Sequence, residues 1–207
     1  MKYINIIFFI LFLGSLVSAQ PVTIRSISSV LNKTETDSIR KIERQAAIKF
    51  HQLLNNYRRK KGRHLLRWNE TLWIASYNHN LWMETNENLS HIQKKGTTNF
   101  TGENPGDRYN YAAGGKSPYS CSAENALYNY SGIGNTIDEI ANNIAVHSLE
   151  LWIDSPDHHE NMLSKNHGMH GTAFRISADG KVWGIDLFAA CDKCPKDEDP
   201  VSPLSDQ

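Results

Sequence analysis

An alternating β-hairpin near the carboxyl end is the feature that most constrains how this chain can fold. The β-favouring residues Thr172, Phe174 and Ile176 occupy every second position. The pair Asp179-Gly180 that follows is typical of a tight hairpin turn, and the alternation then resumes. The apolar residues of the return strand are Trp183, Ile185 and Leu187. Such a pair has to bury its apolar face against other elements, so the remaining chain must cover it.

Helical periodicity supplies that cover. Apolar residues from Ile39 to Tyr57 recur on one helical face, and Gly62 is a stop signal. Asn69 is a suitable N-cap for a second helix that ends near 86–88. A third helix begins at the capping-box sequence Thr136-Ile137-Asp138-Glu139. Helices that surround an antiparallel sheet make the predicted fold class α+β.

Two further segments complete the predicted organisation of the domain. Ser155-Pro156 is expected to restart a short helix, because proline is favoured at the first helical position. Between Ile92 and Ser122 the residues change to Gly, Asn, Pro, Tyr and Lys, which predicts a long irregular stretch. The basic run 58–61 is interpreted as the carboxyl end of the first helix, where the helix dipole favours cations.

The first nineteen residues have the pattern of a secretory signal peptide. Lys2 precedes an apolar run over 6–13, and small residues around Ala19 resemble a cleavage site. A membrane anchor is the alternative, but a spanning helix needs roughly 20 apolar residues and Gly14 interrupts this run. No other stretch could cross a bilayer. We therefore predict a secreted, extracellular protein, with a signal peptide at 1–19 and a leader or linker at 20–36.

Composition excludes one class of partner. The chain has 207 residues, 22 Lys and Arg against 22 Asp and Glu, and 40% hydrophobic residues, as expected of one globular domain. A formal charge of zero gives no electrostatic footprint for nucleic acid, which would need a basic stripe or a strongly basic domain. Nucleic acid is therefore not an expected partner.

Three cysteines remain in the exported chain, so one of them is left over. We predict one disulfide that joins Cys191 or Cys194 to Cys121, with a local Cys191–Cys194 bridge as the alternative. The sequence also contains five Asn-x-Ser/Thr sequons, each of which can accept a glycan if the host is a eukaryote. They lie at Asn32, Asn69, Asn88, Asn99 and Asn129.

Three segments in order resemble one known family. They are His91 after a helix, Ser122-Ala123-Glu124-Asn125-Ala126 after a loop rich in Gly and Tyr, and the run from Trp152 to Leu163. The last reads Trp-x-x-Ser-Pro-x-His-x-x-Asn-x-Leu and is the most specific signal. This order resembles the CAP superfamily of cysteine-rich secretory, antigen five and pathogenesis-related proteins (the SCP domain), and is most similar to its compact, bacterial-type branch.

The resemblance implies a three-layer α-β-α sandwich with a central antiparallel sheet, here over 37–190, followed by a tail over 191–207. It also implies a cleft in which two histidines and acidic residues converge and can hold a divalent metal such as zinc. His91 and His158 match the histidines and Glu124 matches the glutamate of the family's Gly-Glu-Asn motif, although Ala123 replaces its glycine.

Two less favoured positions complete the candidate site. Glu103 belongs to a second Gly-Glu-Asn sequence and competes for the role of Glu124, which we prefer for its position ahead of the Trp152 helix. The family's second glutamate would fall near Ser155 and is missing. The other histidines and aromatic residues are assigned structural rather than functional roles. Four histidines are expected to form a solvated edge, and three aromatic residues are expected to belong to the core. These are His147, His159, His167 and His170, and Trp152, Phe174 and Trp183.

Two function classes compete on these residues. The first is a secreted, non-enzymatic binding module whose cleft holds a ligand, lipid or protein partner. The second is a metal-dependent hydrolase in which imidazoles hold zinc and Glu124 acts as general base. The sequence has no HExxH helix and no Gly-x-Ser-x-Gly elbow, so we favour binding.

Overall fold

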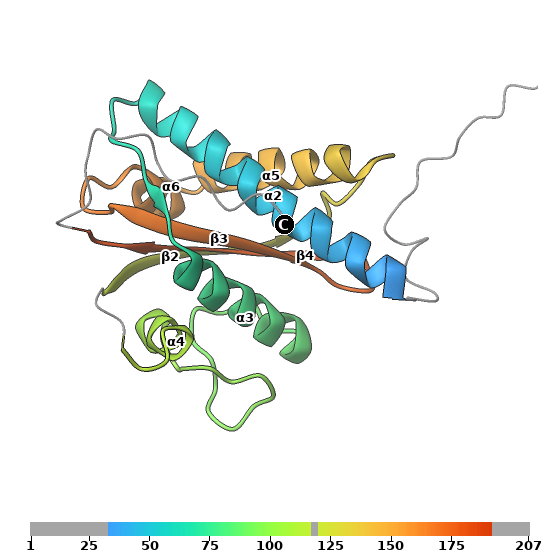
Figure 1. Cartoon of the computed structure of the whole chain (residues 1–207). Helices are drawn as coiled ribbons and strands as arrows, with labels where there is room; N and C mark the ends of the chain where they lie inside the picture. Colours follow the sequence, from blue (N-terminus) through green and yellow to red (C-terminus); the bar gives the residue numbers. More distant parts are fainter. Residues whose placement is uncertain (1–32, 117–119, 192–207) are drawn as a thin grey trace, which may run out of the picture.

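The computed structural model describes residues 33–116 and 120–191, and it folds them into three layers (Figure 1). Helices α2 (Lys33–Lys60), α5 (Ile137–Asp154) and α6 (Pro156–Leu163) cover one face of a sheet, and α3 (Glu70–Asn86) and α4 (Pro105–Ala112) cover the other. The predicted α+β sandwich is confirmed. The predicted signal peptide and nearly all of the tail lie outside the described residues.

The sheet has four strands in the order β1-β3-β4-β2. Strands β3 (Met169–Ile176) and β4 (Val182–Ala189) form the predicted hairpin, and β2 (Cys121–Asn129) pairs antiparallel with β4. The two-residue strand β1 (Arg67–Trp68) runs parallel to β3, so the sheet is mixed rather than wholly antiparallel. Strand β2 was not predicted, because it is polar in sequence and buried along much of its length.

Three of the predicted helix starts can be compared with the structure. Asn69 caps α3 by accepting a hydrogen bond from the Leu72 amide, and Thr136 caps α5 in the same way, as predicted. Helix α2 begins at Lys33, ahead of the predicted start of the domain near residue 37. Helix α4 lies inside the stretch predicted to be irregular, so that prediction is wrong for 105–112.

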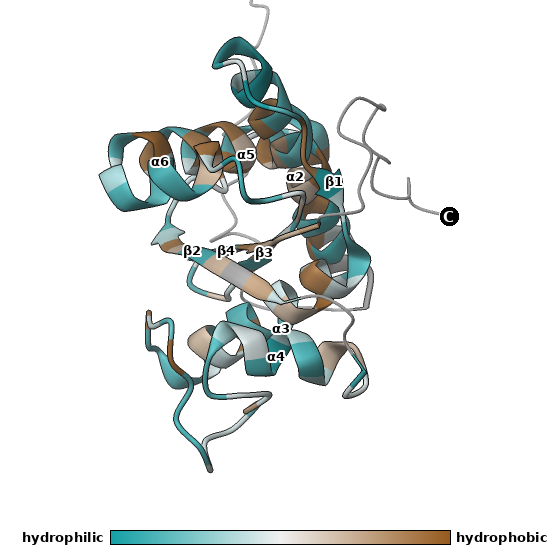
Figure 2. Cartoon of the chain, turned by 90° about the vertical axis from the view of Figure 1, so that its left-hand side faces the viewer, coloured by the Kyte–Doolittle hydropathy of each residue, from teal (hydrophilic) through white to brown (hydrophobic). Residues whose placement is uncertain are grey.

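Two apolar clusters fill the spaces on either side of the sheet (Figure 2). One joins α2, α5 and α6 to the sheet and contains Trp152 and Phe174, and the other joins α3 and α4 to it and contains Trp183. The core assignment of these three residues is confirmed. Every residue of β4 is buried because both faces of this central strand are covered, which hides the simple alternation expected of a half-exposed strand.

Helix α3 approaches the sheet closely at Gly171. A Cβ atom on Gly171 would lie 2.2 Å from the backbone nitrogen of Trp73, so only glycine fits there. Side chains of the helix then bind carbonyl oxygens of β3. Ser76 Oγ donates to the Gly171 oxygen at 2.6 Å, and Asn80 Nδ2 donates to the Ala173 oxygen at 2.8 Å. These bonds fix the position of α3, and with it the start of the loop that follows.

The cysteines do not pair as predicted. Cys121 is a free thiol, so the prediction of a disulfide between it and Cys191 or Cys194 is wrong. Cys191 is disulfide-bonded, and its partner lies outside the described residues. Burial is the main cause that raises the pKa of the Cys121 thiol to about 12, with the nearby charge of Glu124 adding to it. The thiol is therefore protonated at neutral pH.

None of the helices in the described part of the chain has the length and apolar character of a membrane-spanning segment.

Candidate functional site

Strand β2 sends its two consecutive motif residues to opposite faces of the sheet. Glu124 is opposite Leu187 and points toward α3 and α4, whereas Asn125 is opposite Asp186 and points toward α6. This follows from the two-residue period of a strand. The glutamate and the asparagine of the motif therefore serve different layers of the molecule.

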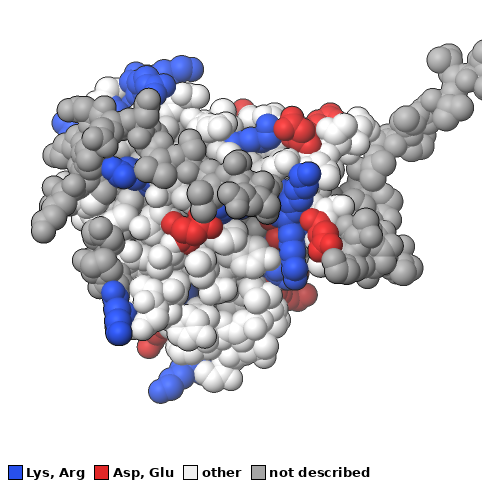
Figure 3. Space-filling view, in the orientation of Figure 1, with Lys and Arg blue, Asp and Glu red and all other residues white. Residues whose placement is uncertain are grey.

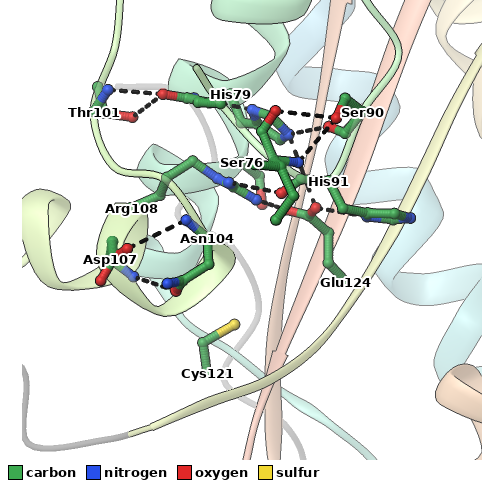
Figure 4. Close-up of polar contacts among 12 residues, drawn as sticks. Ser76, His79, Ser90, His91, Thr101, Asn104, Asp107, Arg108, Cys121 and Glu124 are labelled. Carbon is green, nitrogen blue, oxygen red and sulfur yellow. Dashed lines mark hydrogen bonds and ion pairs between the residues drawn. The ribbon is translucent and has the colours of Figure 1, made fainter. Parts of the chain in front are cut away.

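Glu124 forms a buried ion pair with Arg108 and a hydrogen bond with His91 (Figure 4). Its Oε2 lies 2.6 Å from an Nη atom of Arg108, and its Oε1 accepts from Nδ1 of His91 at 2.8 Å. The Glu124 side chain is 2% exposed and Arg108 is fully buried, but 52% of the His91 side chain is exposed. A buried charge pair therefore holds a histidine at the surface.

Arg108 was missed by the sequence analysis, which placed it in an irregular loop. It lies on α4, which Asn104 starts with a capping box that also involves Asp107. One Nη atom of Arg108 donates to the main-chain oxygens of His91 and Glu103, at 3.0 and 3.1 Å. The guanidinium thus binds both the backbone of His91 and the carboxylate that holds its ring. Nothing local in the sequence marks Arg108 as a buried cation.

The loop that carries His91 is anchored from behind by His79 of α3. Nε2 of His79 donates to the Ser90 oxygen at 2.8 Å, and Nδ1 accepts from the Gln93 amide at 3.0 Å. Gln93 in turn accepts a hydrogen bond from the Thr101 amide at 2.8 Å. His79 and Gln93 are fully buried. The buried side chains of His79 and Gln93 are therefore both hydrogen-bonded, and they hold the loop so that His91 lies beside β2 (Figure 4).

Burial and charge shift the titration of these groups in different directions. Burial raises the pKa of Glu124, but the hydrogen bond from His91 and the charge of Arg108 outweigh it, so the pKa is lowered overall. The hydrogen bond to Glu124 is the main cause that raises the pKa of His91. Burial lowers the pKa of His79 to about 4. The site therefore combines an ionised carboxylate with a histidine that holds its proton more firmly than usual.

His158 lies on α6, the other side of the β2 edge. Its main-chain oxygen accepts from Asn125 Nδ2 at 3.0 Å, and Asn161 donates to the Asn125 side chain at 2.9 Å. Burial is the main cause that lowers the pKa of His158, and the charge of His91 adds to it. The structure thus brings His91 and Glu124 into contact, while His158 touches the motif through its backbone.

The two less favoured candidates have structural roles. Glu103 is exposed, and its main-chain oxygen accepts from Gln93 and from Arg108. Its Gly102 has φ +156, and a Cβ there would lie 2.6 Å from the Cβ of Asp107, so the second Gly-Glu-Asn sequence serves to start α4. Ser155 joins α5 to α6 and makes no side-chain capping bond.

The predicted zinc ligands do not form a metal centre in this arrangement. Both carboxylate oxygens of Glu124 are already engaged, one by His91 and the other by Arg108. Within residues 33–116 and 120–191, no group of three His, Cys, Asp or Glu side chains is placed to hold a metal ion. A metal bound to Glu124 would share these oxygens with His91 and Arg108. Zinc binding therefore stays a prediction.

A second histidine cluster lies on the opposite face of the sheet and was missed. His170 donates from Nδ1 to Asp186 at 2.9 Å, and its Nε2 lies 2.7 Å from Nδ1 of His51. Asn55 lies 3.5 Å from the far nitrogen of His51. His170 and Asp186 are fully buried and His167 is 5% exposed. The assignment of His167 and His170 to a solvated edge is therefore wrong.

The basic run lies at the end of α2, as predicted, and its first residue has a further role. Arg58 is fully buried, and it donates to the main-chain oxygens of His64, Met162 and Ser164. It therefore joins the end of α2 to the end of α6 rather than facing solvent. On the face shown in Figure 3, positive and negative side chains are interspersed over the described surface.

Comparison with known proteins decides the family. The model of the CAP family, described as the cysteine-rich secretory protein family, matches residues 51–192, which is more than half of the chain. The chain belongs to the CAP family. The matched span includes Glu124, His91 and His158, as well as the newly found Arg108. No curated protein sequence matches the chain.

Two solved structures resemble this chain in fold. An extracellular protein with an SCP domain from Bacillus anthracis str. Ames is 18% identical, with a TM-score of 0.56, covering 79% of this chain and 45% of the Bacillus chain. An outer surface protein from Borrelia burgdorferi is 16% identical, with a TM-score of 0.50, covering 68% and 88% of the two chains. At such identities the likeness concerns the fold. The chain spans less than half of the Bacillus protein.

Proposed function

We propose that the protein is a secreted CAP-domain binding module, and that its ligand contacts the half-exposed imidazole of His91. The single observation that carries this proposal is the support of that imidazole by a fully buried Glu124–Arg108 pair. A binding group is most effective when its supporting residues fix it before the ligand arrives. The extracellular and outer-surface descriptions of the two structural relatives agree with export.

The tautomer of His91 determines what it can bind. Because Nδ1 carries the proton shared with Glu124, Nε2 is the nitrogen on the far side of the ring (Figure 4). In the protonated ring Nε2 donates a hydrogen bond, and in the neutral ring it accepts one. The raised pKa favours the donor form. A ligand with a hydrogen-bond acceptor, above all an anionic one, therefore suits His91 best.

The alternative of a metal-dependent hydrolase has weaker support. Glu124 is committed to Arg108, so it is not free to act as a general base on water. The nearby Cys121 thiol, with a pKa of about 12, is a poor nucleophile. Within the described residues, the ring of His91 has no hydrogen bond to a hydroxyl or thiol that it could activate.

The test is a mass-spectrometric survey of small molecules and lipids that copurify with the secreted chain. Wild type is compared with His91→Ala and with the matched control His147→Ala, whose side chain is 49% exposed on α5. We expect at least one compound to be retained by wild type and by the control, and to fall about tenfold in His91→Ala, because a hydrogen bond to a charged group contributes roughly 1.5–3 kcal/mol. Equal recovery of every compound from all three proteins would contradict the proposal.

A further inference from the structure

The five sequons differ in what surrounds their asparagine side chains. Four lie in the described part of the chain, at Asn69, Asn88, Asn99 and Asn129, whereas Asn32 lies outside it. We propose that Asn88 and Asn99 accept N-linked glycans when the chain passes through a eukaryotic secretory pathway, and that Asn69 and Asn129 do not. This assignment does not depend on any ligand of His91, but it rests on the export included in the proposed function.

The chemistry of the transfer sets the structural requirement. The amide Nδ2 of asparagine forms a bond to the anomeric carbon of a lipid-linked oligosaccharide diphosphate. The bond from that carbon to the diphosphate oxygen breaks, Nδ2 loses one proton, and the lipid diphosphate leaves. The glycan then projects from Nδ2, and it is bulky and hydrated. A chain that folds with a glycan must therefore have Nδ2 directed toward solvent.

Asn129 fails this requirement. The residue is 7% exposed, and its Nδ2 donates to Oγ of Ser148, a fully buried residue on α5, at 3.4 Å. Its Oδ1 accepts from both the amide and the hydroxyl of Ser131, at 2.9 and 2.5 Å, so the hydroxyl of the sequon is also engaged. A glycan on Asn129 Nδ2 would push α5 away from the sheet.

Asn69 fails for a similar reason at the start of α3. Its Oδ1 caps the helix by accepting from the Leu72 amide at 2.9 Å. Its Nδ2 points the other way and donates to the sulfur of Met169, a core residue that is 3% exposed, at 3.3 Å. Rotating the amide so that a glycan on Nδ2 pointed into solvent would remove the cap, which stabilises a helix by about 1 kcal/mol.

Asn88 and Asn99 meet the requirement. Asn88 follows the left-handed residue Glu87 (φ 47) in the turn that ends α3, and it is exposed. Asn99 is exposed with φ 62, and its Nδ2 donates to the hydroxyl of Thr85, which is itself exposed. An amide nitrogen carries two hydrogens, so one bond to Thr85 leaves the second hydrogen for substitution.

Both acceptors belong to the loop that carries His91. Leu89, beside Asn88, is 45% exposed, and Ile92, beside His91, is 51% exposed. A hydrated glycan next to these side chains would shield them from unspecific apolar contacts. Glycans at both positions would therefore frame the loop without touching the Glu124–Arg108 pair beneath it.

The test maps glycans on the full chain secreted from a eukaryotic cell line. Peptide N-glycosidase in heavy-oxygen water converts each glycosylated asparagine into a labelled aspartate, which peptide mass spectrometry then locates. We expect the label at Asn88 and Asn99 and none at Asn69 or Asn129. The variants Asn88→Gln and Asn99→Gln should each lose one glycan on a gel, whereas the matched controls Asn69→Gln and Asn129→Gln should lose none.

The map on wild type decides the assignment even if Asn69→Gln or Asn129→Gln fails to fold. A label at Asn69 or Asn129 in secreted, folded protein would overturn it, as would an unlabelled Asn88 or Asn99. A second version carries a heterologous signal peptide in place of residues 1–19. If only this version is exported, the proposed secretion by the native leader is wrong, and its glycan map still tests the acceptor assignment.

Discussion

Two histidine–carboxylate pairs with nearly equal nitrogen–oxygen distances lie on opposite faces of the same sheet. His91 and Glu124 are 2.8 Å apart on the α4 side, and His170 and Asp186 are 2.9 Å apart on the α2 side. The first carboxylate is also bound by Arg108, and its histidine is half-exposed, whereas the second histidine is fully buried against His51. The same contact therefore holds a half-exposed imidazole in one place and joins buried side chains of the core in the other.

The difference also sets how each face responds to protons. On the buried face, His51 and His167 are neutral near pH 7, because burial lowers the pKa of His51 to about 3 and that of His167 to about 4. On the other face, the charged Glu124 raises the pKa of His91. Exposure and the nearest charge, rather than the histidine–carboxylate distance, separate the two kinds of site.

The largest expected effect is acid destabilisation. Unfolded histidines titrate near pH 6.5, but His51, His79 and His167 have folded pKa values of about 3, 4 and 4. Below pH 6.5 the unfolded chain takes up protons that the folded chain does not, so stability falls as the pH falls. Glu43, with its folded pKa raised to about 7 by burial, opposes this only in part. We expect a net loss on the order of 5 kcal/mol between pH 7 and pH 4.

Urea unfolding at several pH values measures this loss. In His51→Gln the difference in unfolding free energy between pH 7 and pH 5 should shrink, because one acid-sensitive group is removed from the buried cluster. In the control His147→Gln, which changes an exposed side chain, the difference should stay as in wild type. A stability that is flat from pH 7 to pH 4 would show that these histidines are not buried in neutral form.

Breaking the buried ion pair should have the next largest effect. Arg108→Met leaves the Glu124 carboxylate buried without its cation, which should destabilise the fold by about 3–5 kcal/mol. The double variant Arg108→Met with Glu124→Gln removes the uncompensated charge and should recover part of that loss. Thermal unfolding of the three proteins checks both expectations. If Arg108→Met unfolds like wild type, the ion pair does not support the site.

The smallest expected effect concerns the affinity for zinc. Because Glu124 is engaged by Arg108, we expect weak affinity that depends on the two imidazoles. Calorimetric titration of zinc should therefore show a loss of affinity in His91→Ala and in His158→Ala. Equal affinity in wild type and both variants would place any bound zinc elsewhere, for example among the other histidines.

Elements with a long periodic pattern were predicted from the sequence, whereas features that depend on tertiary contacts between distant residues were missed. Helices α2, α3 and α5 were predicted because their apolar residues recur over many turns and their caps are local. Helix α4 has only eight residues and begins with Pro-Gly, so its period could not emerge. Strand β2 is buried between two layers, so it lacks the alternation of a strand with one solvent face.

The same reasoning explains the candidate site. His91 and Glu124 were predicted as candidates through the order of motifs, because that order is visible along the chain. Arg108 and His79 were not, because their roles depend on contacts with residues brought together by folding. The buried pair of His170 and His51 is 119 residues apart in sequence, and no local pattern predicts that contact.

The most direct test of the central claim is the titration of His91 by NMR of its imidazole nitrogens. If the buried Glu124 holds the ring, the pKa of His91 in wild type lies above 6.5, the proton of the neutral ring is on Nδ1, and Glu124→Gln lowers that pKa. A pKa at or below 6.5 that does not change in Glu124→Gln would contradict the claim that this carboxylate presents His91 to a ligand.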